Sequence, residues 1–314
     1  MQLGDALPNY QCCQYGDKES SRYPKSRRYI RLAGDEVASD RGLFLARINW
    51  REAPLITEPY EDDTYTTKVA KSTEAELIEQ IRSDIRTALS TGAAKESFDT
   101  TWETKGRATK WALYALGADV CLWAEDYEAA VTFCDAILNA RGVGAPAFLA
   151  TATHSSWFSM FNPGNSNESI FEIQYNYEEN QTNNLPKLFD NEHADGIYRI
   201  SRALTQMFNS EYSATLYEMK EAVRSMYGGY FVGPDATIFE SATVSYVWKY
   251  LGSQTLSDKR TASYYDPNFI IYRVADVMLM KAEALILRTH GENIEDKVEA
   301  MKLINEIRTR SNLE

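Results

Sequence analysis

The sequence predicts a mostly α-helical protein, built on a scaffold of helical hairpins and interrupted by one loop-rich, partly β insertion. Two observations predict the hairpins. Apolar residues recur at helical spacing between residues 73 and 142 and again between 272 and 310, and a short break divides each region into separate helices. A third observation predicts the insertion, because residues 145–270 replace this periodicity with turns, a strand-like run and aromatic side chains.

The composition fits a folded protein with a sizeable core and argues against one class of partner. The chain has 314 residues, of which 44% are hydrophobic and 25% are charged. Its net charge of −12 argues against binding to nucleic acid, which needs a basic face, but is compatible with a neutral ligand such as a sugar. No cofactor is expected.

The cysteines and the N-terminus leave the compartment open. Cys121 and Cys134 lie on the inward faces of two predicted helices, so we expect buried free thiols; the remaining pair, Cys12 and Cys13, is adjacent. No apolar run of about 18 residues predicts a membrane-spanning helix. The first residues lack the features of a secretory signal, which indicates either a cytosolic protein or a mature or truncated form.

The first helical region begins with a clear start signal. Thr73 and Glu76 have the spacing of a capping box, and the apolar face that follows runs to Gly92. A second helix is predicted from about Gly106 to residue 124, and a third from Asp126, its N-cap, to residue 142.

Small residues predict close packing within each hairpin. Ala118 and Ala130 are twelve residues apart in the helix pair around residue 125, a spacing typical of tetratricopeptide repeats. The pair 272–289 and 295–310 repeats the plan with Ala282 and Ala300. The two pairs lie too far apart for a continuous solenoid, so we expect one tetratricopeptide-like scaffold with a large insertion.

The insertion is the expected place for a ligand surface. A strand is predicted at 169–175, and 13 of the 61 residues from 212 to 272 are aromatic, against 12% for the whole chain. The sequence VWKY at 247–250 alternates like a strand and predicts a core position for Trp248, while Trp157 and Phe158 are expected in packing. Most of the other rings would also fill the core of a loop-rich region.

Signals of catalysis are weak. His154, His193 and His290 are scattered without metal-ligand spacing, and neither a nucleophile motif nor a phosphate loop occurs. The acidic run 190–196 (DNEHADG) could hold Ca²⁺, but it is not an EF-hand loop and a solvated loop is the simpler interpretation. A pair of carboxylates for glycoside hydrolysis is not excluded by counting acidic residues.

Four segments, in this order, resemble the SusD/RagB family of nutrient-binding outer-membrane lipoproteins of Bacteroidota. They are APLITEP at 53–59, KGRATK at 105–110 with YEAA at 127–130, NESIFEI at 167–173, and NFIIYRVADVMLMKAEA at 268–284 with INEIR at 304–308. The resemblance implies a SusD-like fold. It also implies that Arg273, Asp276 and Glu283 lock helices together rather than touch a ligand.

The resemblance also implies a function. Such a protein is a non-enzymatic binder of oligosaccharide or another nutrient, and it works with a SusC-like TonB-dependent transporter at the cell surface, held by an N-terminal lipid anchor. That anchor is not visible in this sequence, and the family's early helices and C-terminal region are also missing, so we expect a fragment. A tetratricopeptide-like adaptor and a glycoside hydrolase are the alternatives.

These interpretations divide the chain into four expected parts and a candidate site. Residues 1–60 form an irregular, incomplete N-terminal segment, 61–144 the first helical scaffold, 145–270 the insertion, and 271–314 the second hairpin. The expected ligand-binding residues are rings on or near glycine-flanked turns, because loops on a rigid scaffold concentrate binding residues: Tyr227, Tyr230, Phe231 and Tyr198.

Overall fold

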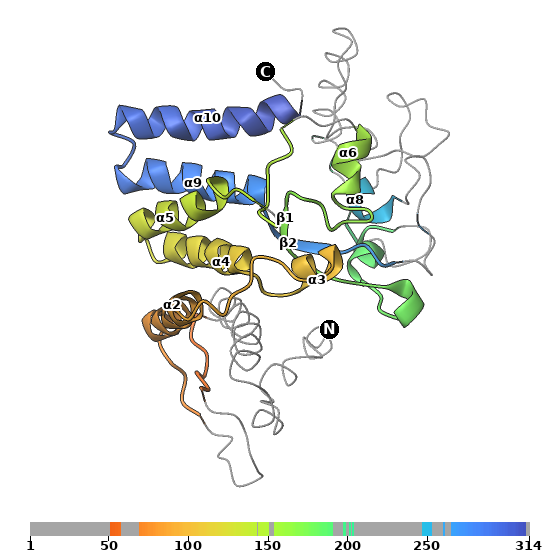
Figure 1. The fold of residues 1–314 in the computed structure, drawn as a ribbon, viewed down its shortest axis with the longest axis horizontal. Coiled ribbons are helices and arrows are strands. Elements are labelled where there is room, and N and C mark those ends of the chain that lie inside the picture. Colours follow the sequence, from red (N-terminus) through yellow and green to blue (C-terminus); the bar gives the residue numbers. More distant parts are fainter. Residues whose placement is uncertain are drawn as a thin grey trace. The chain divides into compact units, whose positions relative to one another are not determined.

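The computed structural model describes residues 51–57, 69–142, 144–150, 154–190, 197–198, 201, 203, 247–252, 260 and 265–311. These residues fall into two compact units, Met1–Ala145 and Pro146–Glu314. The described chain is mostly helical, as predicted, with one small sheet (Figure 1). None of its helices is long and apolar enough to cross a membrane.

The first unit contains the helices α2 (Glu74–Ser90), α3 (Thr101–Gly106), α4 (Lys110–Trp123) and α5 (Tyr127–Leu138). The predicted capping box is confirmed at the start of α2, where Thr73 and Glu76 exchange hydrogen bonds. Asp126 caps α5, also as predicted. The predicted helix from Gly106 was wrong at its start, because Arg107 is extended and Thr109 caps a new helix at Lys110.

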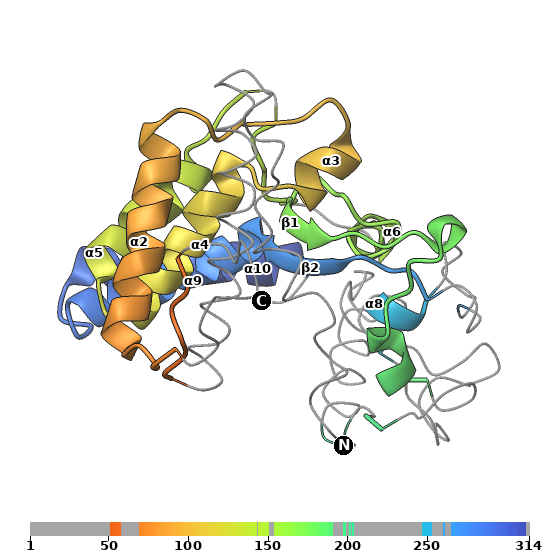
Figure 2. The same cartoon turned by 90° about the horizontal axis from the view of Figure 1, so that it is seen from below.

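The hairpin of α4 and α5 packs closely because its contact residues are small. Ala118 and Ala130 are completely buried, which confirms their predicted role, and Cys121 and Cys134 are buried free thiols. Burial raises the pKa of the Cys121 thiol to about 11. The helix α2 packs along α4, as Figure 2 shows.

The second unit contains a two-stranded antiparallel sheet and two long helices. Strand β1 (Ser169–Ile173) pairs with β2 (Phe269–Arg273), which leads directly into α9 (Val274–Arg288) and then α10 (Ile294–Arg310). Between the strands lie the short helices η3 (Tyr177–Glu179), η4 (Leu185–Leu188) and α8 (Trp248–Leu251), and α6 (His154–Ser159) precedes β1. The positions of Trp157 and Phe158 in packing are confirmed by their burial.

Two predictions of element type in this unit were wrong. Tyr272 and Arg273 belong to β2 rather than to the start of the long helix. The run 247–250 is helical in α8 rather than a strand, because a four-residue apolar run does not distinguish a short helix from a strand.

Ion pairs join α9 to α10, but not the ones that we expected. Lys281 pairs with Glu299, and Arg288 binds the Asp296 carboxylate through Nη2 at 2.5 Å and Nε at 2.8 Å. Ala282 and Ala300 are buried in this hairpin, where their small size allows close approach. The expected locking role of the other charged residues was only partly right: Arg273 and Asp276 pair locally at the helix start. Glu283 is exposed.

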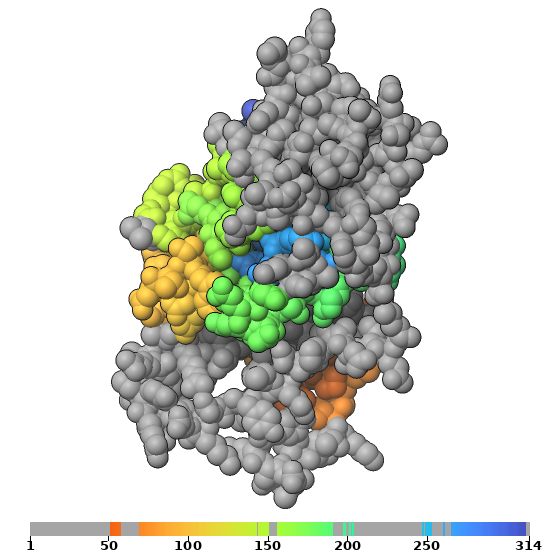
Figure 3. Space-filling view, turned by 90° about the vertical axis from the view of Figure 1, so that its right-hand side faces the viewer, coloured from red at the N-terminus to blue at the C-terminus, as the bar shows by residue number. Residues whose placement is uncertain are grey.

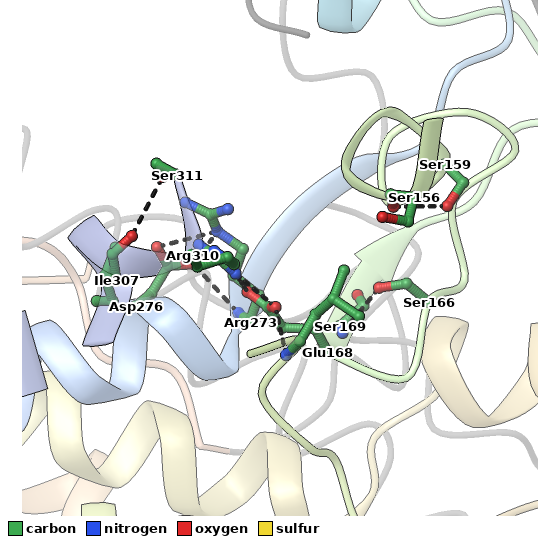
Figure 4. Close-up of polar contacts among 11 residues, drawn as sticks. Ser156, Ser159, Ser166, Glu168, Ser169, Arg273, Asp276, Ile307, Arg310 and Ser311 are labelled. Atoms are coloured by element: carbon green, nitrogen blue, oxygen red, sulfur yellow. Dashed lines mark hydrogen bonds and ion pairs between the residues drawn. The ribbon is translucent and has the colours of Figure 1, made fainter. Parts of the chain in front are cut away.

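A buried ion pair fastens the end of α10 to the segment before β1 (Figure 4). Arg310 donates from Nη1 to both carboxylate oxygens of Glu168 at 2.7 and 2.6 Å, and both side chains are buried. Glu168 also accepts from the Leu149 backbone N–H at 3.0 Å, and the Arg310 guanidinium lies 4.5 Å from the Phe148 ring centroid. This pair joins residues 142 apart in the sequence.

Candidate functional site

The candidate site lies in the second unit and begins with a short helix that is fixed at both ends. Asn183 accepts from the Leu185 N–H at 2.9 Å to start η4, and its own Nδ2 donates to the Pro267 carbonyl at 2.8 Å. After η4, the buried carboxylate of Asp190 accepts from the Tyr265 hydroxyl. Both ends of η4 are therefore attached to the segment that leads into β2.

A second short element, α8, is fixed beside η4. The Gly252 carbonyl, just after α8, accepts from Asn162 Nδ2 at 2.8 Å and from Arg260 Nε at 2.9 Å. Arg260 in turn pairs with Asp266. Asn162 and Arg260 thus fix the C-terminal end of α8, which lies against η4.

These two elements bring three rings together, which we call the aromatic surface: Phe189, Tyr198 and Tyr250. The Phe189 and Tyr250 rings are parallel within 7°, with centroids 5.8 Å apart, and Tyr198 is tilted by 48° with its centroid 6.4 Å from Phe189. The Tyr198 N–H donates to the Leu188 carbonyl at 2.8 Å, which attaches the backbone of Tyr198 to the end of η4. Tyr198 is 59% exposed, while the other two rings are half-buried.

The aromatic surface carries the Tyr250 hydroxyl and has one lysine beside it. Burial raises the pKa of the Tyr250 hydroxyl above its ordinary value of 10, so it stays protonated at physiological pH. Lys249 Nζ lies 5.0 Å from the Tyr250 ring centroid and 5.6 Å from that of Phe161. An exposed ring with hydroxyl groups beside it can stack on the C–H face of a sugar while it bonds the sugar hydroxyls.

A polar network next to β1 supports this part of the unit. The buried carboxylate of Glu172 accepts from the Asn165 N–H at 3.0 Å and from Asn268 Nδ2 at 2.8 Å, and Asn268 also donates to Gln174 at 2.8 Å. Gly164 lies against this network with a φ of +83°. Figure 3 shows the segment that contains β1 and η4, in green, beside the segment that leads into β2, in blue.

Of the four expected ligand-binding residues, one lies in this surface. Tyr198 is exposed and belongs to it, whereas Tyr227, Tyr230 and Phe231 lie outside the described residues. The sequence analysis missed Phe189 and Tyr250. Tyr250 lies in the predicted strand, and Phe189 precedes the acidic run, so neither had a local signal of exposure.

The possible Ca²⁺ site at 190–196 receives no support from the part that is described. Asp190 is buried and bonded to Tyr265, which turns its carboxylate inward, and residues 191–196 lie outside the described residues. Within the described ranges, no group of three or more His, Cys, Asp or Glu residues could hold a metal ion.

Part of the chain matches a known protein family. Residues 175–314 match the model of the SusD family. This match contains the aromatic surface and the α9–α10 hairpin, and it covers less than half of the chain. None of the proteins that carry a curated description matches the chain.

Solved structures of SusD-like proteins share the fold. A SusD superfamily protein from Bacteroides vulgatus superposes with a TM-score of 0.70 at 19% identity, covering 94% of this chain and 62% of that one. A surface glycan-binding protein A from Bacteroides uniformis gives 0.69 at 17% identity, covering 96% and 64%. A laminarin-binding SusD-like protein gives 0.66 at 17% identity, covering 93% and 65%.

The chain is shorter than the structures that it matches. It spans about 65% of the length of the laminarin-binding SusD-like protein. The likeness to these structures shows the fold, and ligand, partners and location are proposed below.

Proposed function

We propose that the protein binds a neutral oligosaccharide at the aromatic surface and does not cleave it. The observation that carries this proposal is the exposed ring of Tyr198 beside the parallel Phe189–Tyr250 pair, which lies between η4, fixed at both ends, and α8, fixed at its C-terminal end. Fixed rings lose little conformational entropy on binding, so the stacking energy goes into affinity. The glycan binding of SusD-family relatives supports the same ligand class, and Tyr227, Tyr230 and Phe231 remain candidates for extending the surface.

We further propose that binding serves uptake. In this proposal the full-length protein sits on the outer surface of the cell, attached by an N-terminal lipid anchor, and passes its ligand to a SusC-like TonB-dependent transporter. The match of residues 175–314 to the SusD family supports this role, and the net charge of −12 fits a neutral ligand better than a nucleic acid.

The test is a titration of the purified chain with a panel of soluble glycans, which includes laminarin because a SusD-like relative binds it. We expect one glycan class to bind, and Tyr198→Ala or Tyr250→Ala to weaken it about tenfold, since a stacking ring contributes about 1–1.5 kcal/mol. Trp102→Ala is the matched control, because Trp102 is also about half exposed (48%) but lies in the first unit.

Two outcomes would contradict the proposal. The first is that no glycan binds, or that it binds equally well to Tyr198→Ala and to the unchanged protein. The second is the release of reducing sugar from a bound glycan, which would favour the glycoside hydrolase alternative. Thermal unfolding of each variant checks that the fold is kept.

A further inference from the structure

A second recessed surface lies in the first unit, where α2, α4 and α5 enclose a groove of about 300 Å³. Its floor is formed by the small residues Gly117, Cys121 and Ala129, and its apolar walls by Ile85 and Phe133. This volume is at the lower end of the range for ligand pockets, so it admits a side chain or two rather than an oligosaccharide.

Two residues of the floor, Gly117 and Cys121, keep it open and uncharged. A Cβ atom on Gly117 would lie 3.0 Å from the Phe133 ring, so the glycine lets that ring lie directly against α4. The raised pKa of Cys121 keeps its thiol uncharged at physiological pH. The groove is thus an apolar surface without a buried charge on its floor.

The rim of the groove on α2 carries two arginines that form different ion pairs. Arg82 pairs with Asp126, the N-cap of α5, and so bridges two of the helices that border the groove. Arg86, one turn further along α2, pairs with Glu79 on its own helix at 2.5 Å, and these two side chains are 58% and 63% exposed. An exposed pair of this kind contributes little to stability, so an incoming carboxylate can displace Glu79 at small cost.

We propose that this groove docks a peptide segment of a partner protein, which inserts one leucine- or phenylalanine-sized side chain and places a carboxylate against Arg86. Burial of the apolar side chain provides most of the affinity, and Arg86 makes the groove select peptides that carry an acidic residue next to that side chain. The occupant is a peptide with a carboxylate beside its apolar side chain, because the groove offers a small apolar floor with one exposed arginine at its rim. The proposal is independent of the glycan-binding proposal, because the groove and the aromatic surface belong to different units.

The test uses the full chain and a displayed library of random twelve-residue peptides. We expect the selected peptides to share a large apolar residue with Asp or Glu about one helical turn away. A synthetic peptide of that consensus, measured by fluorescence polarisation, should bind several-fold more tightly than its Glu→Lys version.

Three variants make the assignment specific. Ala129→Leu fills the floor and should abolish binding, whereas Arg86→Glu should reverse the preference to the Lys peptide. Glu79→Gln frees Arg86 and should raise the affinity for the acidic peptide two- to fivefold. Lys302→Glu is the charge control, since Lys302 is 74% exposed on α10, and should leave binding unchanged.

The proposal is overturned if selection yields no acidic apolar consensus, or if the selected peptides bind Ala129→Leu as well as the unchanged chain. It is also overturned if sedimentation shows that the chain dimerises and that Ala129→Leu dissociates the dimer, because a second copy would then be the occupant. If the unchanged chain binds the selected peptides but no glycan, the result contradicts the glycan proposal and leaves the peptide proposal standing.

Discussion

At the scale of single residues, Gly164 is the position where the backbone and a side-chain network restrict each other. A Cβ atom there would lie 3.0 Å from both Asn268 Nδ2 and Glu172 Oε2, and the φ of +83° is itself costly for any other residue. We therefore expect Gly164→Ala to lower the free energy of unfolding by about 2–3 kcal/mol, measured by urea denaturation.

The matched control is Gly92→Ala. Gly92 has a similar φ of +64°, but a Cβ atom at this position would meet none of the described residues within 4 Å, so only the backbone cost of about 1 kcal/mol is expected. Equal costs for the two substitutions would mean that the contacts with Glu172 and Asn268 do not restrict position 164.

Residue-scale prediction from sequence succeeded where the signal was local. Thr73, Asp126, Ala118 and Ala130 were placed correctly, because caps and small-residue spacings depend on neighbours within one hairpin. The partnership of Phe189 with Tyr250 was not predictable in this way. It depends on two short elements, η4 and α8, being fixed through Asn183, Asp190 and Gly252, whose hydrogen-bond partners lie 84, 75 and 90 residues away in the sequence.

At the scale of elements, the α9–α10 hairpin should show a defined sensitivity to acid. The hydrogen bonds from Arg288 hold the pKa of Asp296 below its ordinary value of 3.8. The folded state therefore binds this proton less readily than the unfolded state, and the stabilisation is complete above pH 3.8 and is lost as the pH falls further. Asp296→Asn should lower the free energy of unfolding at neutral pH. Below pH 4 the unfolding free energy of this variant should fall less steeply than that of the unchanged protein.

The measurement is the midpoint of urea denaturation at several pH values between 2.5 and 7. Glu283→Gln is the control, because Glu283 is exposed on α9 and its substitution should leave the acid limb unchanged. A parallel decline for Asp296→Asn and the unchanged protein would show that another carboxylate governs this range.

The buried pair of Arg310 and Glu168 gives the other prediction at this scale. Glu168→Gln leaves the Arg310 charge buried without a counter-ion and should cost about 3–5 kcal/mol in unfolding free energy. The double substitution Glu168→Leu and Arg310→Met removes both charges and should cost clearly less. The buried Nε and Nη2 of Arg310 have no acceptor among the described residues, so the pair is incompletely bonded even when intact.

The boundaries and types of two elements could not be predicted from the local sequence pattern. The run 272–289 was predicted as one helix, yet Tyr272 and Arg273 belong to β2, because they find a strand partner in β1 about 100 residues earlier. Such a partner is invisible to any window of local sequence. Trp248, Lys249 and Tyr250 of α8 were assigned to a strand because so short a run does not distinguish a helix from a strand.

At the scale of the whole molecule, charge and ligand chemistry predict how binding responds to salt. Stacking of a neutral glycan on the aromatic surface involves no ion pair, so its dissociation constant should change less than twofold between 50 and 500 mM NaCl, although the protein carries a net charge of −12. Peptide binding at Arg86 should instead weaken severalfold over the same range. Titration of both ligands in one salt series separates the two sites, and a strong salt dependence of glycan binding would indicate an anionic ligand.

The pairing of β1 with β2 has a consequence for how this protein can change over evolution. The two strands hold residues 173 and 269 side by side, so the chain between them leaves and returns at the same place. Lengthening such a closed loop costs little, since doubling it adds only about 0.6 kcal/mol of closure entropy. Insertions, deletions and substitutions can therefore accumulate between the strands while the α9–α10 hairpin that follows keeps its packing. A lineage could change the surface of this segment without rebuilding the helices that carry it.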